Sequence, residues 1–193
     1  MMRFEEFKEE VEDLQELAEG WRGKIFRGKW KGEDVAIKVA KSPEKVKAIQ
    51  KEAQILEKLK GIEGFPQILF KGEDFFVYRF IEGKTFGELK PTGEEKKRIL
   101  RDVLEKAYLL DKMGIHRDEF ANIQKNVLID EKGRVFVIDF DRGGFKDNPS
   151  NVRQFLQLLR REGFISQEEA IRLGRLYKEN PEGVIEDIRK ILT

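Results

Sequence analysis

Cysteine is absent from the 193 residues, and histidine occurs once, as His116. The absence of cysteine excludes disulfide bonds, cysteine-ligated zinc, iron–sulfur clusters and cysteine nucleophiles. A single histidine excludes metal sites built from several histidines. Serine occurs only at positions 42, 150 and 166. None of these positions has the sharp strand-to-helix turn of a hydrolase nucleophile, so Ser-His-Asp chemistry is not expected.

Long hydrophobic runs and an excess of charge of one sign are also missing. The longest apolar stretches, such as Phe75-Phe76-Val77-Tyr78, are too short to cross a bilayer. Residues 1–6 are acidic and lack the apolar core of a signal peptide, so we expect a cytoplasmic protein without membrane contact. The sequence has 38 Lys+Arg against 37 Asp+Glu, which gives no indication of a nucleic-acid partner. A hydrophobic content of 39% with a net charge of +1 argues against disorder.

The first 81 residues have a β-rich pattern with helices. Apolar residues at helical spacing predict a helix over residues 3–18. Alternating runs around residues 24–27 and 35–39 predict a hairpin turning at 31–34, and strands are expected at 67–71 and 75–81. Ser42-Pro43 opens a further helix, with Ser42 as N-cap and Pro43 in the first turn. We therefore expect residues 1–81 to form one domain.

Residues 82–84 break this pattern and are the expected linker to a second, mainly helical domain over residues 82–193. Thr92-Gly93-Glu94-Glu95 has the pattern of a capping box that opens a helix reaching Met113, which Gly114 ends. A short hairpin is predicted over 126–130 and 135–140, with its turn at 132–133. Two or three helices close the chain, and one of them is capped by Ser166.

Residues that could carry chemistry fall in several short segments along the chain. Alternation places Ala36 and Lys38 on one face of a strand, while Gly20 and Gly23 lie in a loop before it. Glycines allow backbone N–H groups to approach phosphate oxygens. A buried lysine needs a carboxylate partner, and Glu52 on the following helix is the candidate.

The other two segments lie in the second half. Gly114-Ile115-His116-Arg117-Asp118 precedes Asn126, and Asp139 ends an apolar strand at Val137-Ile138-Asp139. Oxygen ligands placed after strands, together with a third carboxylate, suit a Mg²⁺ ion that bridges phosphates.

In this order the segments resemble the signature set of the protein kinases: glycine-rich loop, strand lysine, helix glutamate, catalytic loop and metal-binding aspartate. The resemblance covers about residues 18–145. The sequence is similar in particular to small atypical kinases such as the RIO kinases, the kinase subunit of the KEOPS complex and short archaeal serine/threonine kinases. The resemblance implies an α+β, minimal two-lobe kinase-like fold. The N-lobe would be 1–81, with the N-terminal helix, and the C-lobe 82–193.

The resemblance also implies a role for each matching residue. Asp118 would orient the acceptor hydroxyl, Lys38 would hold the α- and β-phosphates of ATP, and Glu52 would position Lys38. Asn126 and Asp139 would bind Mg²⁺ or Mn²⁺. The nucleotide-binding set would be Gly20, Gly23, Ile25, Ala36, Lys38, Phe80, Ile81 and Leu128.

The sequence departs from the family pattern in three places. Asp118 and Asn126 are eight positions apart where the family has five, so Asn122 competes with Asn126 as metal ligand. We prefer Asn126 because a strand follows it. Asp141 replaces the glycine of the family's DFG motif, and it is either a second metal ligand or, as we favour, an acid at a helix start. No long activation segment follows, so Arg117 has no obvious phosphorylated loop as partner.

Three functions are compatible with these motifs. The first is a serine/threonine protein kinase that uses ATP on an unknown protein or on itself. The second is an ATP-binding or ATPase module of a larger complex, suggested by the short C-terminal half. The third is a small-molecule kinase similar to the aminoglycoside phosphotransferases, which normally carry a larger helical half. Gly83-Lys84-Thr85 resembles the end of a P-loop, but Tyr78 stands where that motif needs glycine.

Overall fold

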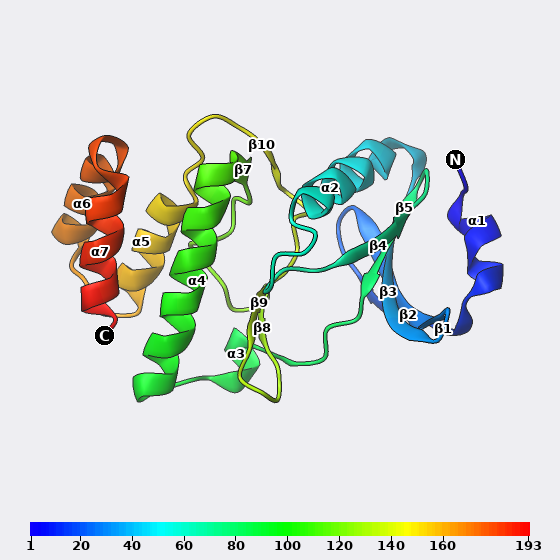
Figure 1. The fold of residues 1–193 in the computed structure, drawn as a ribbon, viewed down its shortest axis with the longest axis horizontal. Coiled ribbons are helices and arrows are strands. Elements are labelled where there is room, and N and C mark those ends of the chain that lie inside the picture. The colour runs from blue at the N-terminus through cyan, green and yellow to red at the C-terminus, as the bar shows by residue number, and fades with distance from the viewer. The chain divides into compact units, whose positions relative to one another are not determined.

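The computed structural model describes all 193 residues and has a mixed α+β fold (Figure 1). The chain divides into two compact units. Unit 1 comprises residues 1–82 and 138–144, and unit 2 comprises residues 83–137 and 145–193. Each unit is described separately. None of the helices combines the length and the apolar composition needed to cross a membrane.

Unit 1 is built on a five-stranded antiparallel sheet with the order β1-β2-β3-β5-β4. The β2–β3 hairpin turns at Lys31-Gly32, where both residues have positive φ (52° and 79°), as a two-residue hairpin turn requires. The elements of this unit are α1 (Phe4–Phe7), the 3-10 helix η1 (Lys8–Glu10), β1 (Glu12–Glu19), β2 (Gly23–Trp30), β3 (Glu33–Ala40), the 3-10 helix η2 (Pro43–Lys45), α2 (Val46–Lys58), β4 (Ile68–Lys71) and β5 (Phe75–Arg79).

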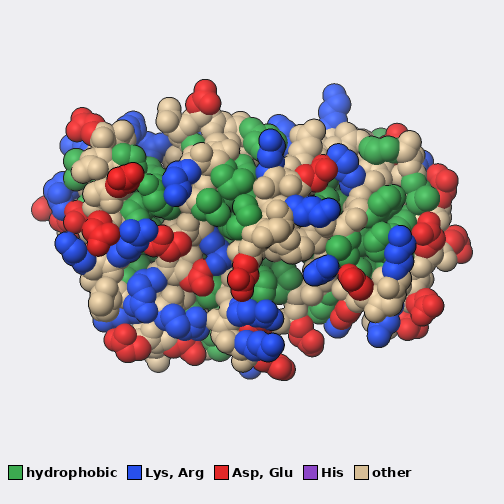
Figure 2. Space-filling view, in the orientation of Figure 1, with side chains coloured by type: hydrophobic (Ala, Val, Ile, Leu, Met, Phe, Trp, Pro, Cys, Tyr) green, Lys and Arg blue, Asp and Glu red, His purple; other side chains and the backbone are tan.

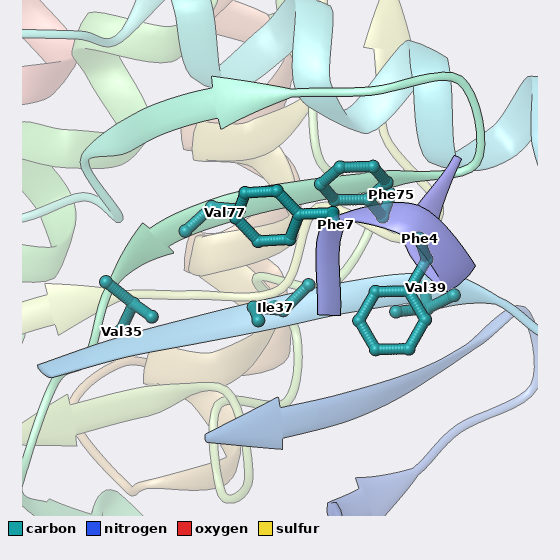
Figure 3. Close-up of a cluster of buried hydrophobic side chains, with 7 residues drawn as sticks. All are labelled: Phe4, Phe7, Val35, Ile37, Val39, Phe75 and Val77. Atoms are coloured by element: carbon teal, nitrogen blue, oxygen red, sulfur yellow. The ribbon is translucent and has the colours of Figure 1, made fainter. Parts of the chain in front are cut away.

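The core of unit 1 explains how its sheet is covered. Alternation along β3 directs Val35, Ile37 and Val39 to one face, where they meet Phe4 and Phe7 of α1 (Figure 3). Phe75 and Val77 of β5 complete this cluster. The opposite face of β3 carries Ala36 and Lys38 and contacts α2. The lysine is therefore held between the sheet and a helix.

The predicted helix over residues 3–18 is wrong. Only Phe4–Phe7 forms an α-helix, and residues 12–19 form β1 at the edge of the sheet. The apolar spacing that indicated one long helix belongs to two elements. Phe4 and Phe7 face the core, whereas Leu17 is 53% exposed. Pairing with β2 supplies hydrogen bonds that the local pattern does not report, and Asp13 at φ 55° lies at a break in the strand register.

Unit 2 contains a three-stranded antiparallel sheet of order β6-β8-β9 and a run of helices in which α4 packs on α5, α5 on α6 and α6 on α7. Its elements are β6 (Lys84–Thr85), α3 (Phe86–Leu89), α4 (Gly93–Met113), β7 (Ile115–His116), β8 (Val127–Ile129), β9 (Val135–Val137), α5 (Asn151–Arg161), α6 (Gln167–Glu179) and α7 (Pro181–Ile191). The two-residue strand β10 (Gly144–Phe145) lies at the boundary of the units.

Helix ends in unit 2 follow the sequence in part. Gly114 ends α4 with φ 71°, the left-handed conformation that glycine adopts at low cost. The Ser166 hydroxyl accepts a hydrogen bond from the Glu169 N–H and so caps α6. Thr92 is the N-cap of α4 without a side-chain cap hydrogen bond, so the expected capping box is not formed. In unit 1, Ser42 likewise precedes η2 without a side-chain cap hydrogen bond.

Candidate functional site

Lys38 lies at the centre of a buried cluster of charges in unit 1. Its Nζ is 2.8 Å from Glu52 Oε1, so the pair expected from the sequence is present. The same Nζ is 3.4 Å from Asp141 Oδ1 and 3.8 Å from Asp139 Oδ1. The Lys38 side chain is 9% exposed. Three carboxylates therefore surround one desolvated ammonium group.

The charges in this cluster fix the protonation state of Lys38. Burial alone would lower the pKa of Lys38, but attraction to Glu52, Asp139 and Asp141 outweighs it and raises the pKa. Burial raises the pKa of Glu52, and Lys38 opposes that rise. Glu52 Oε2 also accepts a hydrogen bond of 3.1 Å from the Phe140 N–H, which ties α2 to the segment carrying Asp139.

Asp141 is part of this cluster and is not a helix-start residue, so the interpretation that we favoured is wrong. Gly143 and Gly144 follow it, and the next helix begins only at Asn151. Arg22 of the glycine-containing loop donates a hydrogen bond to the Asp141 carbonyl and lies 3.9 Å from its carboxylate. The chain is thus held to Lys38 on one side and to Arg22 on the other.

Asp139 has a backbone conformation unusual for a residue with a side chain. Its φ is 69°, and its side chain is 46% exposed. Its Oδ1 accepts a hydrogen bond of 3.0 Å from the Asp141 N–H. Left-handed backbone at a non-glycine residue costs about 1 kcal/mol or more and is found preferentially at functional sites. The carboxylate is therefore accessible as well as close to Lys38.

The two glycines before β3 differ in their surroundings. A side chain on Gly23 would place its Cβ 2.8 Å from the Val39 carbonyl oxygen, so packing against β3 requires glycine there. A Cβ on Gly20 would meet only the Gly23 carbonyl oxygen, at 3.7 Å. The Gly20 N–H donates to that same oxygen and closes a tight turn. Packing against β3 therefore requires glycine at position 23, and the sequence motif did not indicate this requirement.

Four residues of the expected nucleotide-binding set, Ile25, Ala36, Phe80 and Ile81, lie on three segments of unit 1. Ile25 is on β2, and Ala36, which is buried, is on β3 opposite Tyr78 of β5. Phe80 and Ile81 follow β5. The Phe80 N–H donates a hydrogen bond of 3.1 Å to the Asp34 carbonyl, and the Arg27 guanidinium lies 3.7 Å from the centre of its ring. The Phe80 N–H is thus already used within the unit.

Asp118, in unit 2, has the same unusual backbone as Asp139, with φ 67°. Its carboxylate is exposed, and its Oδ1 accepts a hydrogen bond of 3.0 Å from Gln154 Nε2 on α5. Gln154 Oε1 in turn accepts from the Phe120 N–H at 3.1 Å. One amide side chain therefore fixes both ends of this turn of the loop.

Arg117 is completely buried, with 0% exposure. Its guanidinium donates to the Asn126 carbonyl at 3.1 Å and lies 4.9 Å from the Phe120 ring centre. The backbone N–H of Arg117 donates to Asn151 Oδ1 at 3.0 Å. Arg117 therefore holds the loop from inside.

Asn126 and Asn122 differ in burial. Asn126 directly precedes β8 and is 8% exposed, while Asn122 is exposed and its Oδ1 accepts from the Gln124 N–H. Asn126 Nδ2 donates to Glu119 Oε2 at 3.2 Å. Its Oδ1 is buried without a hydrogen-bond partner. Glu119, which lies between Asp118 and Asn126, thus orients the Asn126 amide while the amide oxygen is left without a hydrogen-bond partner.

A divalent cation fits these residues by donor type. The unpartnered Asn126 oxygen in unit 2 and the exposed Asp139 carboxylate in unit 1 are hard oxygen donors of the kind that Mg²⁺ takes. No group of three or more His, Asp or Glu side chains is arranged to hold a metal ion alone. Magnesium is usually bound by one or two carboxylates together with phosphates, and an exposed carboxylate such as that of Asp139 is a donor of that kind.

Sequence reasoning missed the residues that position the loop. Asn151 and Gln154 lie on the first turns of α5 and bond to Arg117 and Asp118, more than thirty positions earlier in the chain. No local pattern indicates such contacts. Leu128 lies in the middle of β8, opposite Thr85 and Phe136.

No family model matches the sequence. Over 181 residues, 88% of the chain, it is 30% identical to "RasGEF domain-containing serine/threonine-protein kinase X" of Dictyostelium discoideum. Over 148 residues, 72% of the chain, it is 30% identical to "Putative serine/threonine-protein kinase YrzF" of Bacillus subtilis. The matches span 18% and 64% of these relatives' lengths. The similarity to proteins named as serine/threonine kinases, together with the mixed α+β fold, supports a kinase-like family for this chain.

Proposed function

We propose that the chain is an ATP-dependent phosphotransferase of the small atypical serine/threonine kinase type. The observation that carries this proposal is the Lys38 cluster. The Lys38 ammonium lies 2.8 Å from Glu52, with Asp139 and Asp141 beside it. Burying such a charge lowers stability, which favours a functional role as the purpose of this cluster. The similarity to two proteins named as serine/threonine kinases favours phosphate binding as that purpose.

Each residue has a defined part in this function. Lys38 contacts the α- and β-phosphates, and Glu52 keeps its ammonium in place. Asp139 and Asn126 would hold Mg²⁺, which would neutralise charge on the phosphates when bound. The Glu119 carboxylate fixes the Asn126 amide for that task.

The transfer itself needs a hydroxyl and a base. The bond between the γ-phosphorus and the bridging oxygen of ATP breaks, leaving ADP, while the acceptor oxygen bonds to phosphorus. The hydroxyl proton passes toward Asp118, which Gln154 orients. We propose a serine or threonine of a protein as acceptor, the protein itself included. Catalysis of this type depends mainly on positioning and electrostatics.

The test follows label from γ-phosphate-labelled ATP with Mg²⁺ or Mn²⁺ into protein and free phosphate. Asp139→Asn and Asp118→Asn should each reduce transfer at least a hundredfold while the melting temperature stays within a few degrees. Asp13→Asn is the matched control, since Asp13 is exposed with φ 55° and lies outside the proposed site. Wild-type transfer rates in both site variants would refute the proposal.

An ATPase module of a larger assembly is the second candidate. The observation in its favour is that only residues 140–150 separate Asp139 from α5, which leaves little chain to dock a peptide. The same experiment separates the two functions. Free phosphate that depends on Asp139, without labelled protein, would favour hydrolysis.

A further inference from the structure

A pocket with several charged side chains lies entirely within unit 2. It has a volume of about 540 Å³ and is lined by side chains of α4, residues 146–149, α5 and α6, and by Pro181 at the start of α7. This volume is in the range of small-molecule sites. None of the residues proposed above for ATP, metal or hydroxyl binding lines it.

The lining of this pocket is strongly cationic. It includes Lys112, Lys146, Arg153 and Lys178 against a single carboxylate, Asp111, so its formal charge is +3 in a chain whose net charge is +1. None of these four cations forms an ion pair with a carboxylate, whereas many other surface Lys and Arg residues do, such as Lys96 with Glu162 and Arg189 with Glu105. On the face shown in Figure 2, charges of both signs are interspersed. The pocket itself therefore has an excess of positive charge that its own lining does not balance.

The one carboxylate, Asp111, is outnumbered by four cations, and both of its oxygens already accept hydrogen bonds within unit 2. Asp111 Oδ2 accepts from the Tyr177 hydroxyl at 2.6 Å and from the Val152 N–H at 3.3 Å, and its Oδ1 accepts from the Asn151 N–H at 3.0 Å. These bonds anchor the start of α5 to α4. Asp111 thus has a structural role that leaves the surrounding cations unbalanced.

Arg153 provides an independent indication of a ligand. It lines the pocket, and its Nε is buried without a hydrogen-bond partner. A buried donor left without an acceptor costs about 1–3 kcal/mol. An anion that accepts this hydrogen bond would recover that cost, and arginine binds phosphate oxygens with more than one N–H.

We propose that this pocket binds a small polyanion of the di- or triphosphate class. A ligand with two or more phosphate groups can reach several of the four cations at once, and it supplies the acceptor that Arg153 Nε lacks. A single negative charge would leave most of the positive charge unmatched. The proposal does not depend on the phosphotransferase function, since it uses other residues.

The experiment is calorimetric titration of the full chain with inorganic pyrophosphate at low ionic strength. We expect binding to the wild type and at least tenfold weaker binding, or the loss of one site, in Arg153→Gln. The double variant Lys146→Gln/Lys178→Gln changes exposed side chains only and gives the same answer if Arg153→Gln does not fold. Lys190→Gln, an exposed lysine on α7 outside the pocket, is the matched control and should bind as the wild type does.

Three results would overturn the proposal. The first is no pyrophosphate binding to the wild type. The second is equal affinity and stoichiometry in wild type, both pocket variants and the control, which would place the anion elsewhere, for instance at Lys38. Weakening by Lys190→Gln to the same extent as by the pocket variants would indicate general charge attraction and would also refute a specific site.

Discussion

Several single residues of the proposed site have features that reduce the stability of the fold. Asp118 and Asp139 both have left-handed backbones, with φ near +67° and +69°, and Lys38 is an almost fully buried cation. Such features reduce stability unless neighbouring groups compensate. Glu52 is the main compensation for Lys38, because it bonds to the ammonium and to the Phe140 N–H at once.

The dependence of Lys38 on Glu52 can be measured. Glu52→Ala should lower the free energy of unfolding by about 3 kcal/mol, because it removes one partner of a buried pair. Glu57→Ala, on the same helix, removes an exposed carboxylate 2.7 Å from Lys71 and should cost less than about 1 kcal/mol. Urea unfolding at neutral pH gives both values. Equal losses in the two variants would show that the Lys38 cluster contributes no more than a surface pair.

Local patterns located most elements correctly, and the errors have identifiable causes. The hairpin, α2 and α4 follow from turn residues and periodicity, which act over a few positions. The helix prediction for residues 3–18 failed because Phe4, Phe7, Val11 and Leu14 have helical spacing. Only Phe4 and Phe7 lie in a helix. Hydrogen bonding of β1 to β2 decided the rest, and that pairing depends on the fold.

A pair of substitutions tests this corrected structure of the first segment. Phe7→Ala should lower the free energy of unfolding by about 3–5 kcal/mol, because Phe7 is 1% exposed among Phe70, Phe75 and Trp30. Leu17→Ala should change it by no more than about 0.5 kcal/mol, since the side chain is 53% exposed on an edge strand. Thermal or denaturant unfolding measures both. A large loss from Leu17→Ala would restore the single-helix interpretation.

At the scale of the whole molecule, the proposed reaction uses residues from both units. Lys38, Glu52 and Asp139 belong to unit 1, while Asp118 and Asn126 belong to unit 2. A ligand that binds the folded chain stabilises it by about 2.7 kcal/mol at a hundred times its dissociation constant. Nucleotide binding should therefore be visible as a change in overall stability.

We expect a non-hydrolysable ATP analogue with Mg²⁺ to raise the melting temperature by about 5–10 °C at such saturation. Removal of the metal with EDTA should reduce this shift. Asp139→Asn should lose the part of the shift that depends on Mg²⁺ and keep the rest, because Lys38 still contacts the phosphates. Differential scanning fluorimetry is the measurement. An identical shift with and without metal in the wild type would argue against a metal at Asp139.

The sequence by itself determined which reactive side chains exist, their order along the chain and the hairpin and helices that carry them. Alternation and glycine or proline positions act over a few residues, so these features can be read locally. Only the tertiary structure decided that Arg117 is buried, that Glu119 orients Asn126 and leaves its oxygen unpartnered, and that Asp141 pairs with Lys38. It also brought four cations around one carboxylate, Asp111, whose two oxygens accept hydrogen bonds. Burial, desolvation and hydrogen bonds between distant residues exist only once the chain has folded, and no local pattern records them.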